Sequence, residues 1–435
     1  MLPIPPVLVL KEIKWGQAVR LSLVGVGRME FQYLTLEDFD VRGKTVLLRL
    51  DINAPLDPGN RQILDDGRIK AAKPTLDALT EAKVAVLSHQ SRPGRGDFTS
   101  MRRHAAELQR ACSQRVTFVS DVMGPSARQA VREMRKGEVV VLDNVRFCSE
   151  EMLEDKGEKL AKTNLVRRLS PLFDLYVNDA FAAAHRAQAS LVGFPQVLPA
   201  AAGKLMEREL SAIEKLMVNP THPSTYLLGG AKVEDKVPVI ENILGTRKAD
   251  HVLVGGNVAK VFLKATDTLL GDSDEDALGD VTDEVLIANQ ILSKYHGRII
   301  LPSDFGTETH RKRTDTPIQK LSKAGRALDI GPATIDRFTK LIKESKTVVA
   351  AGPMGVFEED GFESGTRAVL ESMAEANAFT VVGGGHMAGY AGILGISDQL
   401  SHVSTAGGAM LSMLAGEELP AVTALVAAAK RHKRR

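Results

Sequence analysis

The segment VLLRLDINAPLD, residues 46–57, places polar side chains directly after an apolar run. Side chains two residues apart share one face of an extended strand, so Arg49, Asp51 and Asn53 are expected to point the same way. Pro55 then ends the strand, because proline has no N–H to donate to a neighbouring strand. Taken alone, these residues fit a ligand site and a solvated strand edge equally well.

Basic side chains follow other apolar runs in the first half of the chain. Arginine presents a rigid fork of donors that fits phosphate and carboxylate groups bidentately. A single arginine is more often a surface ion-pair partner, and a single histidine is more often a hydrogen-bonded core residue. Several arginines converging from separate strand ends would instead form a pocket for a small, highly anionic molecule. The residues concerned are Arg68, His89, Arg92, Arg146, His185 and Arg186.

The second half of the chain combines lysines with glycines. In STYLLGGAKVEDK, Lys232 and Lys236 are four residues apart and are predicted to share a face of the helix that follows. The free N–H groups and the dipole at a helix N-terminus suit phosphate groups. The segment is not a G-x-x-x-x-G-K-[ST] loop. No G-x-G-x-x-G fingerprint follows a strand either, which disfavours a dinucleotide enzyme.

Further glycine turns occur in VLVGGNVAK, AAGPMGVFEE, VVGGGHMAG and VSTAGGAM. Each is expected to let the backbone approach a ligand closely, whereas purely structural turns would explain one or two of them. Glu358, after GPMGVF, is a candidate acceptor for both hydroxyls of a ribose. A solvated loop carboxylate is the alternative interpretation of Glu358.

The elements that must position these residues are short apolar strands separated by helix-length segments. Val-, Leu- and Ile-rich runs with this spacing indicate parallel strands covered on both faces, and open α/β sheets bind ligands outside the carboxyl ends of their strands. The runs are TVLLRL, KVAVLSH, RVTFVSD, EVVVLDN, DLYVNDAF, STYLLGG, DHVLVGG, RIILPSD, TVVAAGP and FTVVGGG.

A break between two blocks of strands falls near the middle of the chain. The Pro-, Ala- and Gly-rich stretch LVGFPQVLPAAAG leads into a segment with apolar residues at helical spacing. These apolar residues are Met206, Leu210, Ile213 and Met217. The sequence therefore predicts an α/β fold with two doubly wound, Rossmann-like parallel-sheet domains. A helix over about residues 204–217 joins them, and a hinged cleft lies between them.

The composition narrows the function classes. A chain of 435 residues with 44% hydrophobic residues is long enough for two or three domains, and its net charge of +2 argues against a nucleic-acid binder. Cys112 and Cys148 have no metal-ligand spacing and are expected to be thiols of a reducing compartment. No apolar run approaches the roughly 18 to 20 residues that cross a bilayer. We expect a cytoplasmic monomer that binds neither nucleic acid nor membranes.

The first 28 residues differ from the rest. Their apolar patch, Val7 to Leu10, is too short and too interrupted for a secretory segment, whereas the sequence from Met29 onward has the pattern of a natural start. Residues 1–28 are therefore expected to be a dispensable extension.

Eight motifs now identify a family: VLLRLDINAPL, SHxxRP, NVRF, VNDAFxxAHR, GGAKVxDK, GPMGVFE, GGGH and HVSTxGGA. Their order and spacing resemble those of the phosphoglycerate kinases from about Phe31 to Leu425, and GGGH and GKLMEREL resemble the archaeal branch. The resemblance implies reversible phosphoryl transfer between 1,3-bisphosphoglycerate and ADP, giving 3-phosphoglycerate and ATP in glycolysis and gluconeogenesis. It implies Mg²⁺ bound with the nucleotide. It also implies a phosphoglycerate-binding domain of residues 29–203 plus 413–435 and a nucleotide-binding domain of residues 204–412.

The resemblance also implies roles for individual residues. Arg68 resembles the residue that steadies the transferring phosphoryl group and Lys232 the residue that follows it, with Gly385 and Gly408 completing the catalytic set. The implied substrate ligands are Asp51, Ile52, Asn53, Arg68, His89, Gln90, Ser91, Arg92, Arg146 and Arg186. The implied nucleotide ligands are Lys232, Lys236, Gly255, Gly256, Glu358, Gly384, Gly385, His386 and Met387.

The chain departs from the family pattern on the nucleotide side. His386 stands where many members carry an aspartate that holds Mg²⁺, and a neutral imidazole is a poor ligand for a hard cation. We therefore expect no protein ligand for the metal. Met387 replaces a polar residue, and Ala350 and Ala351 stand where the family has a Trp–Asn pair. Ala406 replaces a glycine, which is a milder change.

A non-catalytic descendant that binds nucleotide or phosphorylated acid is the alternative to an enzyme. Loss of Arg68 or Lys232 would cripple the chemistry and leave binding intact. Both residues are present, which favours the enzyme.

Overall fold

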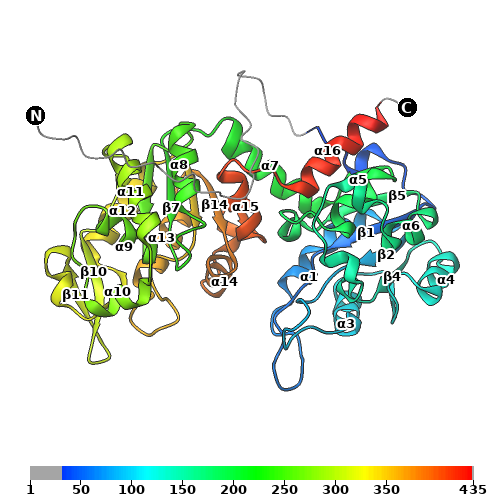
Figure 1. The fold of residues 1–435 in the computed structure, drawn as a ribbon, viewed down its shortest axis with the longest axis horizontal. Coiled ribbons are helices and arrows are strands. Elements are labelled where there is room, and N and C mark those ends of the chain that lie inside the picture. Colours follow the sequence, from blue (N-terminus) through cyan, green and yellow to red (C-terminus); the bar gives the residue numbers. More distant parts are fainter. Residues whose placement is uncertain (1–31, 434–435) are drawn as a thin grey trace, which may run out of the picture.

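The computed structural model describes residues 32–433, which form two α/β lobes lying side by side (Figure 1). Each lobe is built on a six-stranded parallel sheet. The first sheet contains β1 (Thr45–Leu50), β2 (Lys83–Leu87), β3 (Arg115–Val119), β4 (Glu138–Leu142), β5 (Leu175–Asp179) and β6 (Ala200–Ala202), in the order β3-β4-β2-β1-β5-β6. The second contains β7 (Ser224–Leu228), β8 (His251–Val254), β9 (Ile299–Ile300), β13 (Thr347–Ala351), β14 (Phe379–Gly383) and β15 (His402–Ser404), in the order β15-β14-β13-β7-β8-β9.

This architecture confirms the predicted class of two doubly wound parallel sheets. The central strands β5, β7 and β13 are buried at every residue, as expected when helices cover both faces of a parallel sheet. The domain limits given above stay a prediction. The prediction about residues 1–28 lies outside the described residues.

Helices surround both sheets. The first lobe has α1 (Gly67–Ala71), α2 (Lys73–Ala78), α3 (Arg102–Ala111), α4 (Pro125–Glu133), α5 (Gly157–Leu160) and α6 (Asn164–Leu169). The second has α8 (Val237–Gly245), α9 (Gly256–Lys264), α10 (Asp272–Leu278), α11 (Thr282–Lys294), α12 (Pro332–Glu344), α13 (Ser364–Glu375), α14 (Gly385–Ile393) and α15 (Gly407–Leu414). α16 (Pro420–His432) returns to the first lobe and contacts β6 (Figure 1). Across residues 32–433, every helix is too short or too polar to traverse a bilayer.

The strand prediction overlooked a three-stranded antiparallel sheet of β10 (Asp304–Thr309), β11 (Lys312–Pro317) and β12 (Arg326–Ile330). The first two strands are rich in threonine and charged residues instead of apolar ones. Their turn residues, His310 and Arg311, both have positive φ, of 50° and 60°. Such tight turns normally carry Asn-Gly, so the sequence gives no hairpin signal here.

The helix α7 (Lys204–Val218) runs between the lobes and is bonded to both (Figure 1). At its start, the Asp179 carboxylate accepts the Met206 N–H at 3.0 Å and the Thr75 hydroxyl at 2.5 Å. Further along, the Glu209 carboxylate accepts the Thr405 N–H at 2.8 Å and lies 2.8 Å from His402 Nε2. Both carboxylate side chains are buried, so α7 has a fixed place against each sheet.

We predict a pH-dependent stability contribution from Asp179. Burial raises the pKa of Asp179 to about 6, although its bonds from Thr75 and the α7 backbone oppose the shift. The folded state therefore binds more protons than the unfolded state between about pH 4 and 6, and this contribution to stability falls as the pH rises through that window. Urea denaturation of the wild type and of Asp179→Asn, which cannot titrate there, should show a stability difference that changes by roughly 3 kcal/mol across the window. A difference independent of pH would contradict the prediction.

Candidate active site

The carboxyl end of β1 opens into a cluster of charged side chains. Asp51 Oδ1 accepts a hydrogen bond from Arg68 Nη1 at 3.2 Å, and Arg68 projects from α1 with 39% of its side chain exposed. Burial acts to raise the pKa of Asp51, but neighbouring basic groups, including Arg68 and Arg49, lower it overall. Asp51 is therefore an ionised carboxylate near neutral pH. Arg68 is held only at a partly exposed contact, which costs little to break.

Arg49 lies behind this cluster, which differs from the expectation that it faces the same ligand as Asp51. Its side chain is fully buried, and its Nε donates to Ser190 Oγ at 2.7 Å. Its Nη2 lies 3.3 Å from His89 Nδ1 and 4.0 Å from Glu151 Oε1. Buried arginine needs such partners, and the sequence around Glu151 and Ser190 carries no signal that predicts them.

His89 is held in its neutral state by burial and by its charged neighbours. Burial lowers the pKa of His89 to about 3; Asp51 opposes the shift, and Arg49, Arg146 and Arg186 add to it. The ring is therefore neutral at pH 7. Because an arginine N–H can only donate, Nδ1 of His89 accepts from Arg49 and the ring proton sits on Nε2. His89 thus offers one N–H donor away from Arg49.

The loop after β2 is joined to the loop after β1 by side-chain amides. Gln90 is fully buried, and its amide both donates to Ala54 O and accepts from Ala54 N, each at 3.0 Å. Asn53 Oδ1 accepts the Ser91 N–H at 2.9 Å. Ile52 belongs to the hydrophobic core. The side chains of Ile52 and Gln90 therefore contact protein, whereas the amide nitrogen of Asn53 is available to a ligand.

Arg146 lies among other basic groups with little exposure. It lies in a 3-10 helix, Val145–Phe147, and donates from Nη1 to the carbonyl of Ser91. Its buried Nε has no hydrogen-bond partner among the described residues. Burial, together with the charges of Arg186 and Arg49, lowers the pKa of Arg146 to about 10. An anion near this group would relieve the repulsion between the cations.

The remaining basic candidates of the first lobe are less enclosed. Arg186 is half-buried and close enough to influence the titration of both His89 and Arg146. Arg92 is exposed on the loop that follows His89. The structure thus brings most of the predicted substrate ligands to one end of the first sheet.

In the second lobe, Lys232 and Lys236 do not share a helix face. This differs from the prediction. α8 begins at Val237, with a proline in its first turn, so Lys232 and Lys236 lie in the turn that precedes it. Lys232 is exposed, whereas Lys236 is buried. Burial and the charge of Lys232 lower the pKa of Lys236, and Asp235 opposes that shift. A phosphate group beside Lys236 would favour its charged form.

The predicted glycine turn at Gly255 and Gly256 packs against the ends of other strands. Gly256 has φ 53°, and a Cβ there would lie 2.8 Å from the backbone N of Gly230. The Gly256 N–H donates to Met354 O at 3.0 Å, and a Cβ on Gly255 would lie 2.7 Å from Met354 Sδ. The space on the Cβ side of Gly255 and Gly256 is therefore filled by protein, and their role as nucleotide ligands stays a prediction.

The N-termini of α14 and α15 meet at a second pair of glycines. A Cβ on Gly407 would lie 2.6 Å from Gly384 Cα, so the two turns adjoin closely. The first intrahelical bond of α14 runs from Ala388 N to Gly384 O, which leaves the N–H groups of residues 385–387 without intrahelical partners. A Cβ on Gly385 or Gly408 would meet no atom within 4 Å. These helix starts are open and suited to anions.

The side chains that follow Gly385 point in different directions. His386 is exposed, and its ring centroid lies 6.3 Å from that of Phe357. Met387 is fully buried in the hydrophobic core, so its backbone N–H is the group that remains for a nucleotide contact. Glu358 lies on the loop after β13, next to Phe357, and is exposed. Within residues 32–433, no cluster of three or more His, Cys, Asp or Glu side chains has a metal-binding arrangement.

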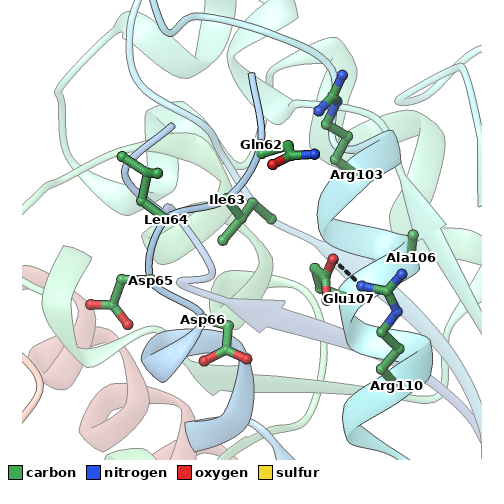
Figure 2. Close-up of a pocket in the computed structure, with 9 residues that line it drawn as sticks. All are labelled: Gln62, Ile63, Leu64, Asp65, Asp66, Arg103, Ala106, Glu107 and Arg110. Carbon is green, nitrogen blue, oxygen red and sulfur yellow. Dashed lines mark hydrogen bonds and ion pairs between the residues drawn. The ribbon is translucent and has the colours of Figure 1, made fainter. Parts of the chain in front are cut away.

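The two halves of the site lie on facing sides of the lobes. α1, which carries Arg68, and α14, which begins at Gly385, both lie toward the other lobe (Figure 1). A separate open cavity of about 770 Å³ lies on the first lobe, where residues 62–66 face α3 (Figure 2). Its lining includes Asp65, Arg103 and Arg110 but none of the candidate ligands, so it is not part of this site.

Comparisons with known proteins agree on one family. The family model described as phosphoglycerate kinase matches residues 36–417. The chain is 44% identical over 405 residues to the phosphoglycerate kinase of Methanothermus fervidus, which covers 92% of this chain and 98% of that relative. It is 42% identical over 413 residues to the phosphoglycerate kinase of Methanococcus maripaludis, covering 92% of this chain and 100% of that relative. The crystal structure of phosphoglycerate kinase from Pyrococcus horikoshii matches with a TM-score of 0.83 and 39% identity, over 92% of this chain and 99% of that one.

We predict that Arg49 supports the site through stability. Arg49→Met would remove the cation that lies 4.0 Å from the buried Glu151 carboxylate and the donor to Ser190 Oγ, and the free energy of unfolding should fall by about 3 kcal/mol or more. Arg68→Met removes a partly exposed contact and should lower it by less than about 1 kcal/mol. Urea denaturation followed by circular dichroism measures both values, and equal losses would show that Arg49 has no such role.

Proposed function

Since the chain belongs to the phosphoglycerate kinase family, we propose that it catalyses reversible phosphoryl transfer between 1,3-bisphosphoglycerate and ADP, giving 3-phosphoglycerate and ATP. The observation that carries this proposal is the crowding of Arg146, Arg186 and His89 at the end of the first sheet, with a buried Arg146 nitrogen left unpaired. Such a pocket attracts a small molecule with several negative charges.

The phosphoglycerate is proposed to bind in the first lobe. The ionised Asp51 accepts a hydrogen bond from the glycerate hydroxyl, and the free amide nitrogen of Asn53 donates to the carboxylate. His89 donates from Nε2, while Arg92, Arg146 and Arg186 neutralise the phosphate. The backbone of Ile52, Gln90 and Ser91 lines the same pocket. We propose residues 29–203 plus 413–435 as this substrate domain.

The nucleotide is proposed to bind in the second lobe, within residues 204–412. The helix starts at Gly384, Gly385 and Gly408 donate backbone N–H groups to its phosphates, and Lys236 neutralises the α-phosphate. Glu358 accepts the ribose hydroxyls. Mg²⁺ enters as part of the nucleotide substrate, held by phosphate oxygens and water, since His386 is a poor ligand for it.

The transfer step needs alignment and charge neutralisation more than covalent help. An oxygen of the ADP β-phosphate attacks the phosphorus of the acyl phosphate, the new P–O bond forms, and the phosphoglycerate carboxylate leaves. Arg68 and Lys232 approach the transferring phosphoryl group from opposite lobes and stabilise the charge on its equatorial oxygens. Both side chains are exposed enough to move to that position.

We further propose that the enzyme acts in the cytoplasm, which fits its free thiols at Cys112 and Cys148.

The first test is steady-state turnover of the purified protein. With 3-phosphoglycerate, ATP and Mg²⁺, and with removal of 1,3-bisphosphoglycerate by a coupling enzyme, we expect robust turnover. Arg68→Ala and Lys232→Ala should each lower kcat at least about a hundredfold, because each removes charge stabilisation from the transition state. Lys70→Ala, which removes an exposed lysine from the same helix as Arg68, is the matched control and should leave kcat unchanged. Absence of turnover with ADP binding intact would favour the non-catalytic alternative.

A second test concerns closure of the lobes. If Arg68 and Lys232 reach one phosphoryl group, the lobes must approach each other when both substrates are bound, which also excludes water. Small-angle X-ray scattering should give a smaller radius of gyration with 3-phosphoglycerate and a non-hydrolysable ATP analogue together than with either alone. An unchanged radius of gyration would argue against hinge closure.

A further inference from the structure

A partly exposed arginine and a buried carboxylate, Arg313 and Asp329, form an ion pair in contact with the loop that carries Glu358. Asp329, on β12, has its carboxylate fully buried, and Oδ2 accepts hydrogen bonds from Arg313 Nη1 at 2.9 Å and from the Gly365 N–H at 2.8 Å. Burial raises the pKa of Asp329 to about 6, although the Gly365 N–H and Arg313 oppose the shift. Neither the reaction nor the two main sheets require this pair.

Arg313 comes from β11, in the antiparallel sheet, and uses its whole donor fork. Besides Asp329, Nη1 donates to Gly361 O at 2.9 Å and Nη2 donates to Ile330 O at 3.0 Å. Nε donates to Asp315 Oδ1 at 3.0 Å. Only arginine has enough planar donors for this arrangement, because lysine presents a single compact ammonium group.

The segment from Gly355 to Gly365, called the Gly355–Gly365 loop although it includes the first two residues of α13, is packed against this pair at both of its ends. A Cβ on Gly355 would lie 2.5 Å from Asp329 Oδ1, and a Cβ on Gly365 would overlap the same oxygen. Near the middle, Gly361 O is held by Arg313. The loop therefore has little freedom to slide along the antiparallel sheet.

The same loop is fixed on its other side by an aromatic contact. Phe357 stacks on Tyr390 of α14, with ring centroids 4.6 Å apart. Glu358 is the next residue, and it lies between this contact and the bond at Gly361. The position of Glu358 relative to the start of α14 is thus set from both directions.

We propose that Arg313 and Asp329 are positioning residues that hold the Gly355–Gly365 loop, and that they thereby set how well the protein selects a nucleotide with a complete ribose. The inference rests on the proposed function, because it uses the ribose-binding role of Glu358. It also assigns a role to the antiparallel sheet, which delivers Arg313 to this loop. A purely structural pair would affect folding stability without affecting ribose selection.

The test compares ATP with 2′-deoxyATP in steady-state turnover of the full-length protein. Wild-type protein should have a higher KM for 2′-deoxyATP than for ATP, because Glu358 loses one hydroxyl partner. In Arg313→Ala, the KM for ATP should rise about tenfold and the preference for ATP should largely disappear, while the KM for 3-phosphoglycerate stays within about twofold. Arg313→Lys keeps the charge without the fork and should fall between the two. Lys312→Ala removes the same charge from the exposed neighbouring position and should match the wild type.

A double mutant separates the possible failures. If Arg313 acts through Glu358, Arg313→Ala should add little to the effect of Glu358→Gln. Fully additive effects, or a rise in the KM for both substrates, would overturn the positioning role. If Glu358→Gln raises the KM for ATP but Arg313→Ala leaves it unchanged, the positioning role fails and the ribose role stands. If Glu358→Gln itself has no effect, the ribose role fails and this inference fails with it. Calorimetric binding of ADP to the same variants gives these comparisons without turnover.

Discussion

Several arginines can share the end of one sheet only if buried acceptors hold them in place. Desolvation and mutual repulsion both disfavour a cluster of cations, and the lowered pKa of Arg146 reflects both effects. Asp51 offsets part of this by accepting Arg68, and Ser190 and Glu151 surround Arg49 from behind. The attraction for an anion is therefore present before any ligand arrives. Positive charge that is already in place stabilises developing negative charge most effectively.

The second lobe attracts anions mainly with backbone groups. Its helix starts lie close together because Gly407 packs directly against Gly384, and a side chain at Gly407 would separate them. Backbone donors need no side-chain ordering, so they bind phosphate at a lower entropic cost than long side chains do. Close packing of glycines also joins the ends of β7, β8 and β13. The two lobes thus present positive potential by different means, charged side chains in the first and open helix starts in the second.

The sequence predicted the fold class because the parallel strands are continuous apolar runs that leave little ambiguity. It also predicted that polar side chains gather at the carboxyl ends of these strands, since polar residues there have no role in a bare core strand. That these side chains form the substrate site stays a prediction. It did not predict the depth at which each side chain lies. Arg49 faces inward because its partners come from residues 151 and 190, which no local pattern links to it.

The helix after Lys232 begins later than the spacing of Lys232 and Lys236 suggested, because Pro238 favours a start at Val237. The glycines near residue 255 pack against Met354, a contact that depends on the arrangement of three strands.

The helix α7 restricts how the lobes can move against each other. Its start is bonded to Asp179 of the first sheet, and Glu209 is bonded to Thr405 in the second lobe. Breaking either contact would leave a buried carboxylate oxygen unpaired, which costs more than bending a backbone torsion in an exposed segment. Rotation of the lobes therefore has to preserve both contacts and occur in the segments next to α7. Because Thr405 lies just before Gly407 and Gly408, the orientation of α7 and that of the α15 N-terminus cannot change independently. The element that joins the lobes thus also helps to fix the N-terminus of α15.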